Sequence, residues 1–215
     1  MVQILIADDH DVMRRGLRDL LLEHTGWEVC AEAKNGREAV VFSAQLHPDV
    51  AVLDISMPEL NGLEATRRIR KQSPHTEVLI FTVYETDQLV RALIRAGANG
   101  YVLKSDAALH LTSAVESLAK GQPFFTPGVS KTLLSGFLNS GEQTRDGGAL
   151  SGLTTREREV VQMLAEGSSN KEVASALSIS VNTVETHRAT IMRKLGITSI
   201  VELVHYAIRN KLIKL

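Results

Sequence analysis

The chain has 215 residues, of which 44% are hydrophobic and 23% charged, so its composition excludes a mainly disordered protein and predicts one large domain or two small ones. The formal net charge of −1 indicates no class of partner by itself. The charge is unevenly distributed, because residues 151–215 hold nine Lys and Arg but six Asp and Glu, a balance of +3 that leaves −4 for the rest.

The only cysteine, Cys30, makes a disulfide within the chain impossible and fits a protein of a reducing compartment. The sequence shows neither a basic segment followed by an apolar leader nor an apolar stretch of membrane-spanning length. We therefore expect a soluble, cytoplasmic protein with no membrane partner.

Residues 1–121 alternate short apolar runs with segments of helical periodicity. Continuous apolar strands indicate a sheet that is covered on both faces. Strands that alternate with helices pair in parallel through right-handed crossovers, which predicts an α/β domain with a five-stranded, doubly wound sheet of flavodoxin-like order 2-1-3-4-5. The expected strands are 2–7, 28–33, 50–53, 77–81 and 100–103, and the expected helices are 11–23, 36–46, 63–72, 86–96 and 106–120.

Four of these strands end in polar residues, which the parallel topology brings to one edge of the sheet. Asp8 and Asp9 follow the first strand, Asp54 the third, Thr82 the fourth and Lys104 the fifth. Three carboxylates crowded together repel one another, and Mg²⁺ relieves that repulsion while it also accepts phosphoryl oxygens. A carboxylate beside such a cation can attack phosphorus and hold the phosphoryl group as an acyl phosphate. The edge is therefore predicted to handle phosphoryl groups.

Taken one at a time, these residues favour plainer interpretations. Paired acids after a strand are usually solvated turn or helix-cap residues, and a lone lysine is usually a surface charge. Their joint placement favours the phosphoryl site instead. The pair Asp8-Asp9, the D-x-x-M-P-x-x-x-G stretch at 54–62, Thr82 and Y-V-L-K at 101–104 resemble the receiver domain of response regulators over residues 3–120.

This resemblance assigns a role to each residue. It implies that Asp54 is the phosphoacceptor and that Lys104 contacts the phosphoryl group, with Thr82 and Tyr101 as a coupled switch pair. It implies that Mg²⁺ is bound by Asp9, Asp54 and the backbone carbonyl of Ser56, with Asp8 acting through water. No enzymatic activity is implied beyond Mg-dependent self-phosphotransfer to Asp54 and autodephosphorylation. Many receivers have proline after the lysine, whereas this chain has Ser105, which makes a cis peptide bond costly there.

The turn after Asp54 is expected to be formed by Met57-Pro58 and Asn61-Gly62, with Gly62 supplying permissive backbone angles. Residues 122–150 are predicted to be a linker. Thr126-Pro127 signals a helix start, and apolar spacing carries that helix to about Leu138. The polar, glycine-rich residues 139–149 then predict a flexible tether, which spans roughly 18 Å.

Residues 151–215 predict an all-α domain. Three capping boxes, formed by Thr154 with Glu157, Ser169 with Glu172 and Ser199 with Glu202, mark helix starts, and Ser180 caps one more. The expected helices are about 155–166, 170–177, 181–195 and 200–211. The tight turn at 178–180 gives helix-turn-helix spacing.

The helix at 181–195 separates into an apolar stripe and an exposed stripe that becomes basic at its end, as a recognition helix in the major groove requires. The helical pattern alone leaves open a protein-interaction domain, since +3 is a weak electrostatic signal. The pattern T-x-R-E-x-x-V…N-K-E-V-A…L-x-I-S-x-x-T-V-x-x-H…K-L resembles a LuxR-type helix-turn-helix over 151–212. The resemblance implies that Glu185, Thr186 and Ala189 face bases and that Lys171, Asn182, Thr183, Arg188, Arg193 and Lys194 lie near phosphates. Glu185 departs from the basic residue that this position often carries.

Together the two parts resemble NarL/FixJ-type response regulators. The resemblance implies a sensor histidine kinase as donor, double-stranded DNA as target, and a homodimer on phosphorylation or DNA binding. Two alternatives stay open. One is a phosphatase with an aspartyl nucleophile, which is disfavoured because Ser56 cannot serve as the general acid that it needs. The other is a receiver-controlled protein-interaction module that does not bind DNA.

Overall fold

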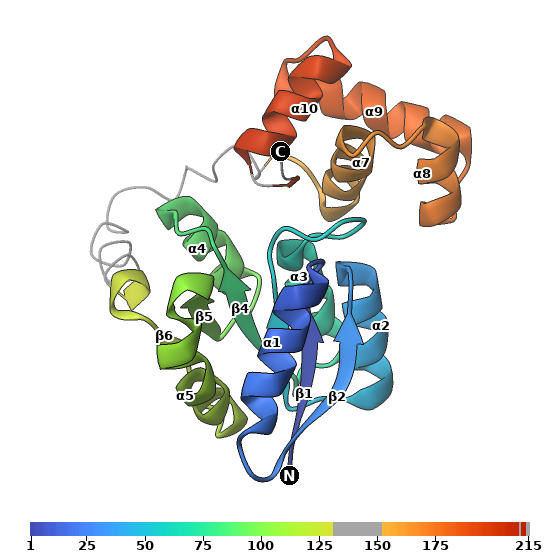
Figure 1. Cartoon of the computed structure of the whole chain (residues 1–215). Coiled ribbons are helices and arrows are strands. Elements are labelled where there is room, and N and C mark those ends of the chain that lie inside the picture. The colour runs from blue at the N-terminus through green and yellow to red at the C-terminus, as the bar shows by residue number, and fades with distance from the viewer. Residues whose placement is uncertain (131–151, 211, 214–215) are drawn as a thin grey trace. The chain divides into compact units, whose positions relative to one another are not determined.

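The computed structural model describes residues 1–130, 152–210 and 212–213, and its chain divides into two compact units (Figure 1). The first is an α/β unit and the second is helical, and each is described by itself. Within these residues, no helix combines the length and the apolar character that crossing a membrane requires.

The α/β unit is built on a parallel sheet of six strands in the order β2-β1-β3-β4-β5-β6. The predicted order of the first five strands is therefore confirmed. The sixth strand was not predicted, because two residues are too few to show an apolar period. The strands are Val2–Ala7, Trp27–Ala33, Val50–Leu53, Glu77–Thr82, Gly100–Leu103 and Phe124–Phe125.

Five helices cover the sheet (Figure 1), and all lie within two residues of their predicted bounds. Helices α1 and α5 share one apolar core with alternate residues of the strands, among them Ile6, Val52 and Phe81. The intervening strand residues, such as Leu5 and Leu53, are also fully buried and face the opposite side. The helices are α1 (Asp11–Leu22), α2 (Gly36–Leu46), α3 (Gly62–Gln72), α4 (Asp87–Arg95) and α5 (Ala107–Ala119), with a 3-10 turn at Lys104–Asp106 before α5.

The residues that follow α5 pack with the sheet. Strand β6 pairs with β5, and a helix begins at Pro127, as predicted, with Val129 fully buried. The continuation of that helix to Leu138 and the tether at 139–149 lie outside the described residues, so the domain boundaries at 121 and 150 stay predictions. The described residues contain no cis peptide bond, so Ser105 follows Lys104 through a trans bond.

The helical unit contains α7 (Thr155–Ala165), α8 (Asn170–Leu177), α9 (Val181–Leu195) and α10 (Ile200–Arg209). All three predicted capping boxes are present, and the Ser180 side chain accepts a hydrogen bond from the backbone N–H of Thr183. Val160, Val184, Ile191 and Leu203 belong to the core that joins the four helices. The predicted four-helix arrangement is confirmed.

Candidate functional site

The predicted acidic residues meet at the carboxyl edge of the sheet. Asp8 follows β1 and Asp54 follows β3, and these strands are paired neighbours. Ligand atoms of Asp8, Asp9, His10 and Asp54 all lie within 4.8 Å of one another. Asp8 is 0% and Asp54 3% exposed, so the fold buries two carboxylates side by side. Such burial is costly unless cations balance the charge.

Lys104 supplies one such cation from the turn after β5. Its Nζ lies 2.5 Å from Asp8 Oδ2 and 3.0 Å from Asp54 Oδ2, and its side chain is 8% exposed. The ammonium group thus bridges the two buried carboxylates, and the plain interpretation of Lys104 as a solvated surface charge is excluded.

Other polar groups besides the lysine belong to this edge of the sheet. Asp54 Oδ1 accepts a hydrogen bond of 2.7 Å from the backbone N–H of Ile55, and Oδ2 faces Lys104. The hydroxyl of Ser56 is buried and has no hydrogen-bond partner in the part of the chain that the structure describes. A site that binds a hard cation and its oxygen ligands is expected to contain clustered carboxylates and a buried hydroxyl without a protein partner. The residues therefore fit Mg²⁺.

His10 belongs to this cluster and was missed by the sequence analysis. Its Nδ1 lies 3.0 Å from Asp9 Oδ1 and 3.2 Å from Asp8 Oδ1, and its backbone N–H donates to Asp8 Oδ1 at 2.9 Å. The signal was present in the sequence, since His10 directly follows the two acids after the strand. The imidazole adds a nitrogen that could bind a metal ion.

The prediction that Gly62 is needed for its backbone angles is wrong. Its φ is not in the positive range, and the positive φ of this turn, 62°, belongs to Glu59. Glycine is required by close approach instead, because a Cβ at position 62 would lie 2.1 Å from the carbonyl oxygen of Asp54 and 2.9 Å from Cα of Ile55. The N–H of Gly62 also donates to the carbonyl of Ile55 at 2.8 Å. Gly62 thus allows α3 to pack directly against the backbone that carries Asp54.

Thr82 and Tyr101 are linked through the backbone of Tyr84. The fully buried Thr82 accepts a hydrogen bond of 3.3 Å at Oγ1 from the N–H of Tyr84, and the Tyr101 hydroxyl donates to the carbonyl of Tyr84. Burial raises the pKa of Tyr101, so its hydroxyl stays protonated and remains a donor. A shift of the loop after β4 would therefore change the hydrogen bonds of both side chains.

In the helical unit, α9 exposes most of the face that the sequence predicted. Val184 and Ile191 are fully buried, whereas Glu185, Thr186 and Ala189 are exposed. The exposed residues on this helix also include Asn182, Thr183, Arg193 and Lys194, and Arg188 is half-buried. The Thr186 hydroxyl donates to the carbonyl of Asn182 at 2.9 Å, within the same helix.

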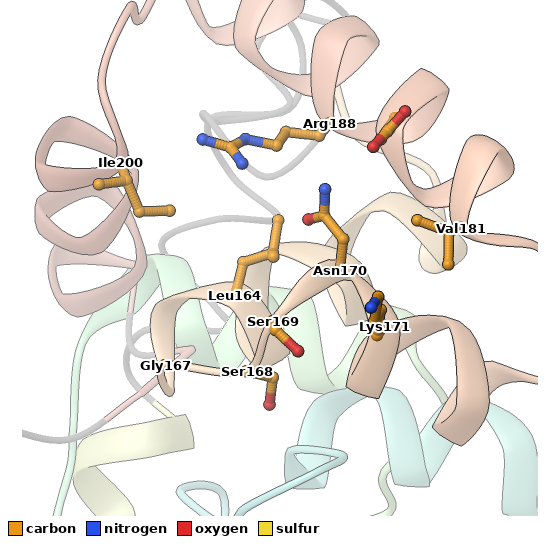
Figure 2. Close-up of a pocket in the computed structure, with 10 residues that line it drawn as sticks. Leu164, Gly167, Ser168, Ser169, Asn170, Lys171, Val181, Arg188 and Ile200 are labelled. Atoms are coloured by element: carbon orange, nitrogen blue, oxygen red, sulfur yellow. The ribbon is translucent and has the colours of Figure 1, made fainter.

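A pocket of about 560 Å³ brings Lys171 and Arg188 together. Figure 2 shows Arg188 reaching across from α9 above Asn170, at the start of α8. Glu185 lines the same pocket. Two cations beside the N-terminal end of a helix favour an anion, since their charges and the helix dipole act in the same direction.

Lys194 is engaged within the helical unit. Its Nζ donates to Glu157 Oε2 at 2.8 Å, which joins the end of α9 to the start of α7. Desolvation raises the pKa of Glu157, but hydrogen bonds from Lys194 and Thr154 outweigh it and leave the pKa below its ordinary value. The expected placement of Lys194 near a phosphate stays a prediction, and it would require this pair to open.

Both units match known protein families. Residues 4–116 match the family described as "Response regulator receiver domain", and residues 151–207 match "Bacterial regulatory proteins, luxR family". These matches cover the two units that carry the acidic cluster and the helix-turn-helix.

Similar proteins extend over nearly the whole chain. The chain is 38% identical to the oxygen regulatory protein NreC of Staphylococcus carnosus, over 99% of both chains. It is 34% identical to the transcriptional regulatory protein LiaR of Bacillus subtilis, over 99% of this chain and 100% of LiaR. It is also similar to RcsB of Salmonella enterica serovar Typhimurium bound to promoter rprA with BeF3⁻ (25% identity, TM-score 0.61, 95% of this chain and 97% of RcsB). Another RcsB structure holds two dimers bound to two parallel DNAs, with 26% identity, TM-score 0.58 and coverage of 95% of this chain and 96% of RcsB.

Proposed function

The chain belongs to the two-component response regulators that join a receiver to a LuxR-type DNA-binding domain, and we propose that phosphorylation of Asp54 controls its binding to specific DNA sequences and hence transcription. The family is one of regulators rather than enzymes with a separate substrate. The observation that supports the proposal is the convergence of Asp8, Asp9, Asp54 and Lys104 at one edge of the sheet.

In the proposed reaction, Asp54 Oδ2 attacks the phosphorus of a phosphohistidine on a sensor kinase. An O–P bond forms and the P–N bond breaks, and the imidazole of the donor leaves with the bonding pair and is protonated. Asp54 Oδ1 is held by the N–H of Ile55, which orients the carboxylate during attack. Lys104 lies 3.0 Å from Oδ2, so its positive charge can stabilise the negative charge on the transferred phosphoryl oxygens.

Asp9, Asp54 and the backbone carbonyl of Ser56 would hold the cation, with Asp8 acting through water. Mg²⁺, when bound, supplies positive charge to the phosphoryl oxygens and neutralises the crowded acids. The same edge would serve the slow hydrolysis of the acyl phosphate, in which water attacks phosphorus and Asp54 leaves as a carboxylate. A kinase partner follows from the receiver, and a bacterial regulator of transcription would work in the cytoplasm, where the DNA is.

The proposed switch runs from Thr82 through Tyr84 to Tyr101. A phosphoryl oxygen near Asp54 is a new acceptor for the Thr82 hydroxyl, whose oxygen now accepts from the N–H of Tyr84. Movement of Thr82 would shift Tyr84 and thereby the partner of the Tyr101 hydroxyl. Such a switch would repack the surface of α4, β5 and α5 and change the oligomeric state of the chain.

On the DNA side, we expect α9 to enter the major groove with Glu185, Thr186 and Ala189 toward the bases. Lys171 and Arg188 would meet a phosphate at their shared pocket, with Asn182, Thr183 and Arg193 along the backbone. One weakly basic domain binds loosely, so a homodimer that engages two half-sites would supply the affinity. The RcsB dimers bound to DNA support this arrangement.

The switch predicts that Thr82→Ala still accepts phosphate but loses most of its response. The hydroxyl is the group that would bond to the phosphoryl oxygen, and a ligand shifts an equilibrium only through contacts that differ between states. Oligomeric state and duplex affinity would be measured with and without an acyl-phosphate donor. Thr86→Ala is the matched control, because Thr86 is exposed in the same loop and its side chain caps nothing. A full phosphorylation-dependent change in Thr82→Ala would contradict the switch.

The pocket predicts that Glu185→Lys raises affinity for non-specific duplexes. The substitution removes a negative charge beside Lys171 and Arg188 and adds a positive one, so the salt dependence should steepen by about one phosphate contact. Preference at one base pair per half-site should change by about 1–3 kcal/mol. Glu185→Gln, which removes only the charge, and Glu185→Ala should give smaller gains. Binding by all three variants like the parent would place residue 185 away from the groove.

The same binding series separates the proposal from its rivals. Association with a protein partner that does not depend on salt, together with no affinity for any duplex, would favour the interaction module. Turnover of a phosphate ester by the chain would favour a phosphatase, although no acid stands at position 56 to protonate a leaving group.

A further inference from the structure

Arg14 is a buried cation below the acidic edge for which the proposed reaction gives no role. Its side chain in α1 is 8% exposed, and its two terminal nitrogens donate hydrogen bonds whereas its buried Nε has only an ion-pair contact among the described residues. Its NH1 group donates to the backbone carbonyl of Asp8 at 2.8 Å, and its NH2 group donates to Asp11. Its Nε lies 3.5 Å from Glu32 Oε2 in β2. The guanidinium therefore ties α1 and β2 to the turn that carries the acidic pair.

Arg14 completes the set of contacts that holds Asp8. The N–H of Asp8 donates to the carbonyl of Ala33 at 3.2 Å. Its Oδ1 accepts from the backbone N–H of His10 at 2.9 Å, and its Oδ2 accepts from Lys104 at 2.5 Å. The backbone carbonyl of Asp8 is the remaining polar group, and Arg14 donates to it.

That carbonyl matters because it orients the next residue. A peptide unit is planar, so the carbonyl of Asp8 and the nitrogen of Asp9 lie in one plane. Fixing the carbonyl fixes the direction in which the chain enters Asp9. Asp9 needs such support more than Asp8 and Asp54 do, because its side chain is 26% exposed and the other two carboxylates are buried and bound to Lys104.

The guanidinium is suited to this position. It carries several donors in a rigid plane and stays charged at any ordinary pH, so it can hold a carbonyl and two carboxylates together. Arg18 shares Glu32, with NH1 3.0 Å from Oε1, but no hydrogen bond or ion pair from it to Asp8 is found in the described residues.

We propose that Arg14 is a positioning residue that sets the Asp8–Asp9 turn for the divalent cation and, through it, for phosphotransfer to Asp54. This inference rests on the proposed function. Residues that orient metal ligands typically change metal affinity by 10- to 100-fold when they are replaced, so the effect should be visible in cation binding itself.

The test measures Mg²⁺ affinity of the full chain by calorimetric titration, and phosphorylation rate as a function of Mg²⁺ concentration with an acyl-phosphate donor. Arg14→Gln is expected to weaken Mg²⁺ binding about tenfold. Arg14→Lys keeps the charge but not the fork, and should weaken binding by about threefold. Arg18→Gln is the matched control, because it removes the shared contact to Glu32 and a contact to the exposed Asp19. It should stay within about twofold of the parent. Saturating Mg²⁺ should restore most of the rate to Arg14→Gln and none to Asp54→Asn.

Three results would overturn the inference. The first is parental Mg²⁺ affinity in folded Arg14→Gln, or in Arg14→Lys if the glutamine variant does not fold. The second is an equal loss in Arg18→Gln, which would assign the effect to general electrostatics. The third is a lower rate in Arg14→Gln that saturating Mg²⁺ leaves unchanged. Failure of the parent to bind Mg²⁺, or phosphorylation of Asp54→Asn, would instead contradict the proposed function.

Discussion

Asp54→Asn is expected to abolish incorporation of phosphate from small acyl-phosphate donors in the presence of Mg²⁺. The amide has no anionic oxygen to attack phosphorus, and it removes one of the two carboxylates that Lys104 bridges. The two side chains are nearly the same size, so the buried position should tolerate the change. Phosphate would be measured as radiolabel or as added mass on the intact chain.

The matched control for this prediction is Asp19→Asn, since Asp19 is an exposed carboxylate on α1 that is not part of the acidic cluster. It should accept phosphate at the rate of the parent. Acid-labile phosphate that persists on Asp54→Asn would show that another residue is the acceptor, and the proposed chemistry of Asp54 would be wrong.

Gly62→Ala is expected to destabilise the receiver by about 3 kcal/mol and to slow phosphorylation strongly. The new Cβ would lie 2.1 Å from the carbonyl oxygen of Asp54 and 2.9 Å from Cα of Ile55, and both are backbone atoms of the segment that carries the phosphoacceptor. That segment or α3 must move, so Asp54 would leave its position beside Lys104. Urea unfolding of the parent and the variant measures the loss of stability.

Gly16→Ala is the control for this substitution. A Cβ at position 16 meets nothing within 4 Å, and alanine in the interior of α1 should stabilise the chain by about 0.5–1 kcal/mol. An unfolding midpoint of Gly62→Ala equal to that of the parent would mean that α3 can retreat freely, and would contradict the close packing inferred here.

The sequence predicted the position of the acidic edge because two strong regularities combine there. Apolar runs of strand length define the strands, and parallel topology brings their ends together, so Asp8, Asp54 and Lys104 could be placed in one site without coordinates. The helix starts at Thr154 and Ser199 could also be predicted from the sequence, since a capping box is a pattern of four consecutive residues. Local patterns and the order of strands thus accounted for most of the fold.

Features that depend on three-dimensional distances were not accessible from the sequence. Nothing near Gly62 distinguishes a glycine needed for its φ from one needed because the backbone of Asp54 lies against it. Lys194 pairs with Glu157, which is distant in sequence. Arg14 donates to the backbone carbonyl of Asp8, a contact that no pattern of side chains could reveal. Strand β6 forms because β5 offers an open edge, and two residues carry too little pattern to predict it.

Duplex affinity with and without phosphate on Asp54 tests the central claim most directly. A target duplex would be obtained by capturing genomic DNA with the phosphorylated full chain, and dissociation constants would be measured at one fixed salt concentration. The phosphorylated parent should bind this duplex at least about tenfold more tightly than the unphosphorylated parent, as a dimer on two half-sites. Asp54→Asn should show only the weak affinity, whether or not it is treated with the donor. Equal affinity of both forms of the parent, or equal gains in Asp54→Asn, would contradict control of DNA binding by this receiver.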